Sequence, residues 1–162
     1  MKNMIKNCLK SSIGFGIASG IITTLGLMVG LYSSTFSRGV VIAGILTIAI
    51  ADSLSDAMGM HLAEETEGVH TDREIWNSTF FTFLTKFIVT ISFLPSFFIF
   101  SLKFSIISNI LWGFILIFIF SYLLSIQQKK RPIKAALEHS FLLLAVVVIT
   151  YIVGRGIDKL FL

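Results

Sequence analysis

The chain has 162 residues, of which 55% are hydrophobic and 14% charged, and its mean hydropathy is +0.89. Soluble domains contain roughly 45–50% apolar residues, so a water-soluble fold of this length could not bury so much apolar surface. The formal net charge of +4 and the sequence pI of about 9.4 indicate basic anchors at an anionic lipid surface, and nucleic-acid binding is not expected. We therefore predict an integral membrane protein.

Five stretches are long enough to cross a bilayer as helices. About 20 residues, each rising 1.5 Å, span a ~30 Å hydrocarbon core. Two of the stretches contain no charged residue, and the other three contain only a few. Lipid excludes an open sheet, and the apolar runs lack the alternation of a β-barrel. The predicted fold is an all-α membrane protein with five transmembrane helices, at residues 11–32, 39–62, 76–102, 104–127 and 135–157.

The distribution of lysine and arginine predicts the orientation of these helices. An odd number of spans places the two termini on opposite sides, and cytoplasmic segments carry the excess of positive charge. With the N-terminus inside, eight such residues are cytoplasmic and four are outside, which favours N-in and C-out. The eight are Lys2, Lys6, Lys10, Arg73, Lys129, Lys130, Arg131 and Lys134, and the four are Arg38, Lys103, Arg155 and Lys159.

The N-terminal segment has an alternative interpretation. Lysines before an apolar stretch also begin a cleaved signal peptide, but this stretch is longer than a signal h-region of roughly 7–15 residues and is rich in glycine, so an uncleaved helix is favoured. Cys8 is the only cysteine, which excludes an intramolecular disulfide and leaves lipidation as a weak alternative. The longest polar stretch is residues 63–77, so we predict one transmembrane domain with a short acidic cytoplasmic loop.

Small residues line one face of the first span. They recur at steps of three and four, which permits close approach of another helix backbone. Helix packing within one subunit, a homodimer seam and a narrow permeation path all fit this pattern. The residues are Gly16, Gly20, Thr23, Gly26 and Gly30.

The second span carries two carboxylates within the membrane. Asp52, Asp56 and Met60 are spaced i, i+4 and i+8, so they share one helical face, with Ser55 and Gly59 beside it. A charged aspartate facing lipid costs on the order of 2.5–3.5 kcal/mol, so this face should meet protein or water. Oxygen ligands with a thioether suit Fe²⁺, Mn²⁺ or a similar divalent ion.

Lys86 in the third span offers another interpretation of the same aspartates. It could form a buried structural ion pair with them, or act as a competing cation when no metal is bound. Met60 could equally be a side chain that fills space in the core.

Acidic and histidine residues gather at the cytoplasmic end of the second span. They would raise the local cation concentration, although a solvated turn with helix-capping acids is the alternative. We expect His61, Glu64 and Glu65 to bind metal here. At the start of the fifth span, Glu138 and His139 are a possible proton relay, and helix capping is about as well supported. The seven potential ligands at the cytoplasmic end of the second span are His61, Glu64, Glu65, Glu67, His70, Asp72 and Glu74.

Three segments carry a family signature. Residues 19–30 read Ser-Gly-Ile-Ile-Thr-Thr-Leu-Gly-Leu-Met-Val-Gly, residues 51–59 read Ala-Asp-Ser-Leu-Ser-Asp-Ala-Met-Gly, and residues 150–154 read Thr-Tyr-Ile-Val-Gly. The first two resemble Asp-Gly-x-x-Thr-Thr and Ala-Asp-x-x-Ser-Met-Ala-x-Gly of the vacuolar iron transporter family, and the third resembles the end of its fifth helix. This resemblance covers all five spans in order.

The resemblance implies a five-helix subunit that dimerises, with metal and protons passing along the dimer interface. It therefore implies a pathway and dimer face on the first helix, made by Gly16, Ser19, Gly20, Thr23, Gly26 and Gly30. The chain departs from the family pattern at three ligands. The pathway aspartate of helix one corresponds to Ser19, the helix-two methionine to Asp56, and the acidic residue four positions further to Met60. The chain also resembles short members that lack the family's cytoplasmic metal-binding domain.

Our first hypothesis is a dimeric, proton-coupled exporter of Fe²⁺ or Mn²⁺ from the cytosol, in a prokaryotic plasma membrane and with no permanently bound cofactor. Asp52 and Asp56 would be the central ligands and proton carriers. Met60 would be a soft ligand, and Ser19 with Thr23 would form the facing wall. The alternative is a non-transporting membrane interaction protein that keeps the fold. An enzyme is not expected, because no Ser/His/Asp, HExxH or phosphate-loop arrangement occurs.

Overall fold

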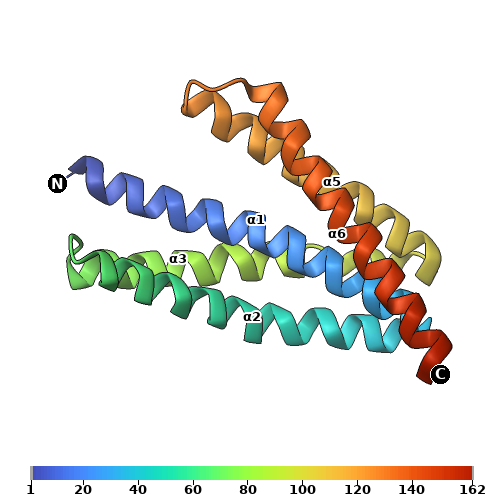
Figure 1. The fold of residues 1–162 in the computed structure, drawn as a ribbon. Coiled ribbons are helices and arrows are strands. Elements are labelled where there is room, and N and C mark those ends of the chain that lie inside the picture. Colours follow the sequence, from blue (N-terminus) through green and yellow to red (C-terminus); the bar gives the residue numbers. More distant parts are fainter. Residues whose placement is uncertain (1, 162) are drawn as a thin grey trace. The chain divides into compact units, whose positions relative to one another are not determined.

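The computed structural model describes the backbone of residues 2–161 and the side chains of residues 9–161, so Lys2, Lys6 and Cys8 lie outside the described side chains. Within this range the chain forms helices joined by short turns, and no strand occurs (Figure 1). The helices are α1 (Lys2–Thr35), α2 (Arg38–Glu67), α3 (Asp72–Ile91), α4 (Pro95–Ile99), α5 (Leu102–Gln127) and α6 (Pro132–Phe161).

Among the residues that the structure describes, five helical segments are long and apolar enough to cross a membrane, which confirms the predicted all-α fold with five membrane-length helices. The orientation of these helices and the homodimer remain predictions. The segments are Leu9–Thr35, Arg38–Glu67, Asp72–Ile99, Leu102–Gln127 and Pro132–Phe161.

The helices bury many polar residues and expose many large apolar ones. On α3 the buried side chains include Ser78 and Thr82, whereas Trp76 and Phe80 face outward at 65% and 57% exposure. The buried side of α5 likewise includes Asn109. A water-soluble protein has the reverse arrangement, because exposed apolar surface is unfavourable in water. This pattern suits a hydrocarbon environment, in which polar groups must find partners inside the protein.

The predicted third span, 76–102, differs from the structure because it is divided into two helices. α3 ends at Ile91, and Pro95 begins α4. Proline has no N–H group to donate, so it interrupts a continuous helix but is favourable at the first position of a new one. The side-chain amide of Asn109 donates a hydrogen bond of 2.9 Å to the Phe93 carbonyl beside this break. Such a partner makes a broken helix tolerable within a membrane.

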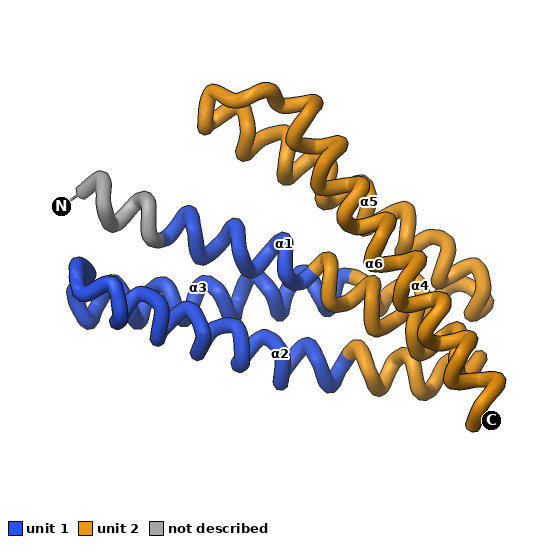
Figure 2. The backbone as a smooth tube through the Cα atoms, viewed as in Figure 1, with its two compact units in different colours: residues 1–20, 46–92 blue, residues 21–45, 93–162 orange. Residues whose placement is uncertain are grey.

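The helices form two compact units, coloured separately in Figure 2. Unit 1 comprises residues 1–20 and 46–92, which are the first part of α1, the second part of α2, and α3. Unit 2 comprises residues 21–45 and 93–162, which include the remainder of α1, the start of α2, and α4 to α6.

In unit 1, glycines on α1 allow its backbone to lie against α3. A Cβ atom added at Gly16 would lie 2.9 Å from the Thr82 carbonyl oxygen and would collide with the Thr85 hydroxyl. A Cβ atom at Gly20 would lie 3.3 Å from the Lys86 carbonyl oxygen. The small residues of α1 therefore pack helices within one subunit at these two positions.

Unit 2 uses the same kind of packing with different partners. A Cβ atom at Gly26 would lie 3.1 Å from Val146 on α6, and one at Gly154 would lie 2.5 Å from the Gly30 carbonyl oxygen. On α5, Gly113 faces the Leu25 side chain. Glycines thus permit α1 to approach both α5 and α6 inside unit 2.

Candidate functional site

Three charged side chains of unit 1 meet within the membrane-length helices. The Lys86 ammonium lies 2.5 Å from Oδ2 of Asp52 and 2.5 Å from Oδ2 of Asp56. The Ser19 hydroxyl donates a hydrogen bond of 2.6 Å to the same Asp56 oxygen and accepts one of 3.0 Å from Lys86. Helices α1, α2 and α3 each contribute to this group, which we call the Asp–Lys cluster (Ser19, Asp52, Asp56 and Lys86).

Regular helix geometry explains why the two aspartates can share one ammonium. Residues four positions apart project from the same face of a helix, one turn above the other. Asp52 and Asp56 meet this condition on α2, and Lys86 comes from the buried face of α3. Ser19 can reach this position because Gly16, one turn before it, and Gly20, the next residue, let α1 approach α3 closely.

The electrostatics of the cluster are unusual for a membrane interior. The Lys86 side chain is only 1% exposed, while Asp52 and Asp56 are 31% and 19% exposed. Two carboxylates against one ammonium leave one formal negative charge, which favours a further cation. Ionised residues inside membrane spans are costly, and they usually mark ion pathways or proton relays. Three oxygen-bearing side chains are present, so a hard or borderline divalent cation could be held after the ammonium moves away.

One face of α2 beside the aspartates is exposed and made of small residues. At this face the side chains recur every fourth position and are all exposed. A Cβ atom added at Gly59 would meet nothing within 4 Å. A membrane helix with such a surface can approach another helix closely. The residues, here called the α2 small face, are Thr47, Ala51, Ser55, Gly59 and Ala63.

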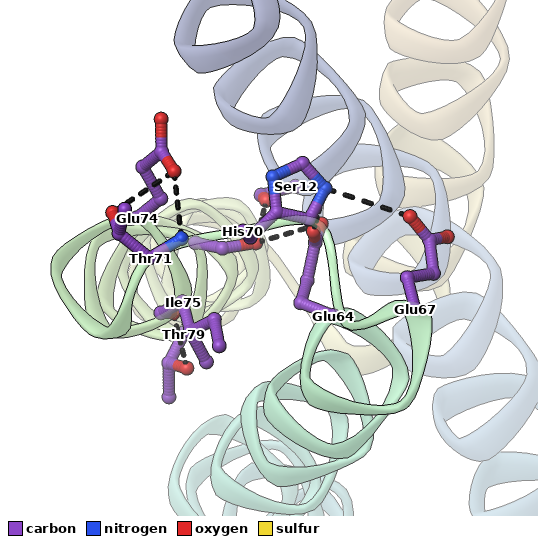
Figure 3. A network of polar contacts seen from close by, with 9 residues as sticks. Ser12, Glu64, Glu67, His70, Thr71, Glu74, Ile75 and Thr79 are labelled. Carbon is purple, nitrogen blue, oxygen red and sulfur yellow. Dashed lines mark hydrogen bonds and ion pairs between the residues drawn. The ribbon is translucent and has the colours of Figure 1, made fainter. Parts of the chain in front are cut away.

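A second group of potential ligands lies at the loop end of unit 1 (Figure 3). Nε2 of His70 lies 2.9 Å from Oε2 of Glu64 and 3.5 Å from Oε2 of Glu67. The ligand atoms of these three residues all lie within 4.8 Å of one another, so they could hold a metal ion. Glu64 and His70 are 8% and 10% exposed, whereas Glu67 is 65% exposed. We call this group the Glu–His cluster (Glu64, Glu67 and His70).

A tight turn brings His70 back to α2. Gly68 follows the last residue of α2 with a φ of 65°, a conformation that glycine adopts without steric cost. The adjacent Glu74 is engaged elsewhere, because its carboxylate accepts hydrogen bonds from the backbone N–H and the hydroxyl of Thr71, at 2.8 and 2.9 Å. This is the capping arrangement expected at the start of α3, as Figure 3 shows.

The three residues predicted to bind metal at the end of the second span, His61, Glu64 and Glu65, do not form one cluster of ligand atoms. His61 hydrogen-bonds to the Thr79 hydroxyl at 2.9 Å and packs edge-on against Trp76. Glu65 is exposed. Of these three, only Glu64 joins a cluster, with Glu67 and His70. Those two residues are among the seven potential ligands named from the sequence but were not predicted to bind metal.

Met60 and the two predicted relay residues of α6, Glu138 and His139, lie outside both clusters. Met60 is half-buried one turn beyond Asp56, as its spacing predicts. Glu138 lies 3.7 Å from Lys134 in an exposed pair one helical turn apart. His139 hydrogen-bonds to the Ser121 hydroxyl at 2.8 Å within unit 2. An exposed pair of this kind contributes little to stability, and the proton relay through Glu138 and His139 stays a prediction.

The predicted pathway face of α1 is divided between the two units. Gly16, Ser19 and Gly20 belong to unit 1, where the glycines contact α3 and Ser19 joins the Asp–Lys cluster. Thr23 and the later glycines belong to unit 2, in which Gly26 and Gly30 lie against α6. Packing within one subunit accounts for the glycines, and a dimer seam on this face stays a prediction.

No protein-family model matches the chain, and no curated protein matches it. The resemblance to the vacuolar iron transporter family therefore remains a prediction carried by residues 19–30 and 51–59.

Proposed function

We propose that the protein transports divalent transition-metal cations, Fe²⁺ or Mn²⁺, across a membrane through the Asp–Lys cluster. The observation that supports this most strongly is an aspartate pair at the middle of a membrane-length helix, neutralised in part by a lysine that is almost completely buried. Removing ionised groups from water is costly and a buried ion pair is weak evidence for stability, so a functional role for this group is favoured.

The cluster can exchange one cation for another. The Lys86 ammonium occupies the position between two carboxylates at which a divalent ion would be held, so an arriving metal displaces it. Two carboxylates balance one divalent charge, and the Ser19 hydroxyl supplies a third oxygen. Carboxylates that bind either metal or protons couple the two fluxes by competition. We propose proton-coupled efflux on this basis.

The Glu–His cluster would collect metal before it reaches the membrane interior. Two carboxylates and an imidazole suit Fe²⁺, Mn²⁺ or Zn²⁺ more than the hard ions Mg²⁺ and Ca²⁺. The positive-inside distribution favours a cytoplasmic position for this loop, with the N-terminus inside and the C-terminus outside. Efflux from the cytosol follows from that orientation, and the compact format suits a prokaryotic plasma membrane.

A second copy of the chain would cover the α2 small face. Asp52 retains 31% side-chain exposure beside this face, and a carboxylate exposed to lipid is unfavourable. Small residues at steps of four permit two α2 helices to pack closely. We therefore propose a homodimer seam on α2, where the Gly59 position is open, in contrast to the predicted seam on α1.

The alternative function is a membrane assembly protein that transports nothing. It is favoured by the same Lys86 contacts, because a permanently paired ammonium would make the aspartates structural.

Flux into liposomes separates the two functions. Purified protein is reconstituted with an internal metal-sensitive dye, and Mn²⁺ or Fe²⁺ uptake is recorded with and without a pH gradient. We expect flux that the pH gradient accelerates, and a loss to about a tenth or less in Asp56→Asn, because one carboxylate cannot replace two. The control Asp158→Asn, which removes a carboxylate paired with Arg155 in unit 2, should behave as wild type. No flux of either metal in any gradient would leave the assembly function.

A further inference from the structure

The interior of unit 1 is made mainly of polar side chains. Apart from glycines, its buried apolar side chains among the described residues are only Ala49, Ala57 and Ile75. Eight polar or charged side chains are buried in the same unit. They are Ser12, Ser53, Glu64, Glu74, Ser78, Thr82, Lys86 and Thr90. In unit 2 the apolar residues dominate, with thirteen buried apolar side chains against seven polar ones.

The polar residues of α3 form a continuous line between the two clusters. Ser78, Thr82, Lys86 and Thr90 are each 0% exposed and recur at every fourth position, so they share one face. At one end, the Ser78 hydroxyl donates a hydrogen bond of 3.3 Å to Glu64 of the Glu–His cluster. Lys86 belongs to the Asp–Lys cluster. Thr82 therefore lies between the two clusters, about 6 Å along the helix from each neighbour in the line.

Several buried polar atoms of unit 1 lack a protein hydrogen-bond partner. These include the hydroxyls of Thr82 and Ser53, both on residues with 0% exposure, and Nδ1 of His70. Oε2 of Glu64 and Oδ2 of Asp52 have an ion-pair partner only. Among the described side chains, every buried polar atom of this kind belongs to unit 1.

The Thr82 hydroxyl could have bonded to its own helix but does not. Thr79 and Thr85, on the same helix, donate to the carbonyls of Ile75 and Phe81 at 2.8 and 2.6 Å. Leaving a buried hydroxyl without a partner costs about 1–3 kcal/mol, so Thr82 needs a partner from outside the chain. A single water bridges polar groups roughly 6 Å apart and needs two to four polar neighbours, which this line supplies.

We infer that unit 1 contains a hydrated route along α3, which admits water and small cations from the Glu–His cluster to the Asp–Lys cluster. The route lies where α3 faces both α1 and α2. Ser78 hydrogen-bonds to Ser12 on α1 and Glu64 on α2. Lys86 hydrogen-bonds to Ser19 on α1 and Asp56 on α2. It runs inside one subunit, whereas the family resemblance implies a path along the dimer interface. The route rests on the proposed function for its role, since it gives the cation access to Asp52 and Asp56.

Cysteine accessibility tests the route directly. In a Cys8→Ser background, Thr82→Cys and Ser53→Cys are treated in liposomes with a small cationic methanethiosulfonate, and unmodified thiols are then counted with a polymer-linked maleimide in SDS. Thiols react with this reagent only where water reaches them. The control is Thr24→Cys, because Thr24 is also 0% exposed and near the middle of a span, but belongs to unit 2 and has an interaction partner within the chain.

We expect both unit 1 cysteines to be modified at least about tenfold faster than the Thr24→Cys control, since thiolates form in water and not in a dry interior. Equal rates at all three positions, whether slow or fast, would overturn the hydrated route. Mixed results at Thr82 and Ser53 would also overturn it, because Thr82 lies between the two clusters and Ser53 directly follows Asp52, which the route must reach. Ser12→Cys and Ser78→Cys variants that elute as wild type extend the comparison if either primary variant fails to fold.

Added Mn²⁺ separates this inference from the proposed function. Metal held at Asp52 and Asp56 should slow modification of Thr82→Cys, and the additional change Asp56→Asn should remove that protection. Fast modification that Mn²⁺ does not affect would support the route and count against metal binding at the cluster. Mn²⁺ flux in liposomes without modification of either cysteine would support transport and overturn the route.

Discussion

Replacing Lys86 with methionine should strongly destabilise the contact between α2 and α3. The substitution keeps a similar side-chain volume but leaves two carboxylates without their 2.5 Å ammonium partner. Breaking a buried ion pair on one side typically costs about 3–5 kcal/mol, and the partial exposure of Asp52 and Asp56 favours the lower value. A loss of about 3 kcal/mol shifts the unfolding equilibrium roughly 150-fold.

Unfolding by SDS in mixed micelles measures this loss. Trp76 reports on the α2–α3 contact because its ring centroid lies 4.9 Å from that of His61, and Trp112→Phe removes the other tryptophan. The matched control is the neutral triple variant Asp52→Asn, Asp56→Asn, Lys86→Met, which should regain most of the stability because no uncompensated charge remains. Wild-type stability in Lys86→Met, or equal instability in the triple variant, would refute the electrostatic explanation.

Three further predictions concern packing, metal binding and the helix break. Gly16→Val should destabilise the monomer by about 1–3 kcal/mol, because the added side chain overpacks against α3. Gly59→Val should leave the unfolding midpoint unchanged but reduce crosslinking of a dimer. The opposite pattern would mean that the dimer seam is on α1. His70→Ala should weaken Mn²⁺ binding, measured by calorimetry, at least about tenfold, and the exposed Glu65→Gln should not; equal effects would show a general charge contribution. Asn109→Leu should lower stability by about 1–3 kcal/mol in the same SDS assay because it leaves the Phe93 carbonyl without this donor, and an unchanged midpoint would mean that another donor replaces it.

The sequence predicted the helices more completely than their interruptions. Long apolar runs determine where a chain can cross a bilayer, because every backbone group must be satisfied within the helix. The break between α3 and α4 depends on one residue, Pro95, within an otherwise apolar run, and run length alone does not reveal it. The glycines of α1 predicted close backbone approach correctly, but a periodic pattern carries no information on which helix approaches.

The candidate sites divide in a similar way. Asp52 and Asp56 could be placed on one face because helix geometry fixes residues four apart. Lys86 was recognised as an alternative partner, but which partner it meets depends on the packing of α3 against α2. The association of Glu64 with His70 could not be derived from spacing, since it depends on the reversal at Gly68 and not on a regular helix.

The position of Lys86 also bears on biosynthesis. A lysine at the centre of an inserting segment costs about 2.5–3.5 kcal/mol during translocon-mediated insertion, so α3 is a poor membrane span when it emerges alone. Its two carboxylate partners lie on α2, which is synthesised immediately before it, and only residues 68–71 separate the two helices. Pairing inside a nascent hairpin would neutralise opposite charges before either helix meets lipid. The order of these helices along the chain therefore favours the integration of α3 into the bilayer.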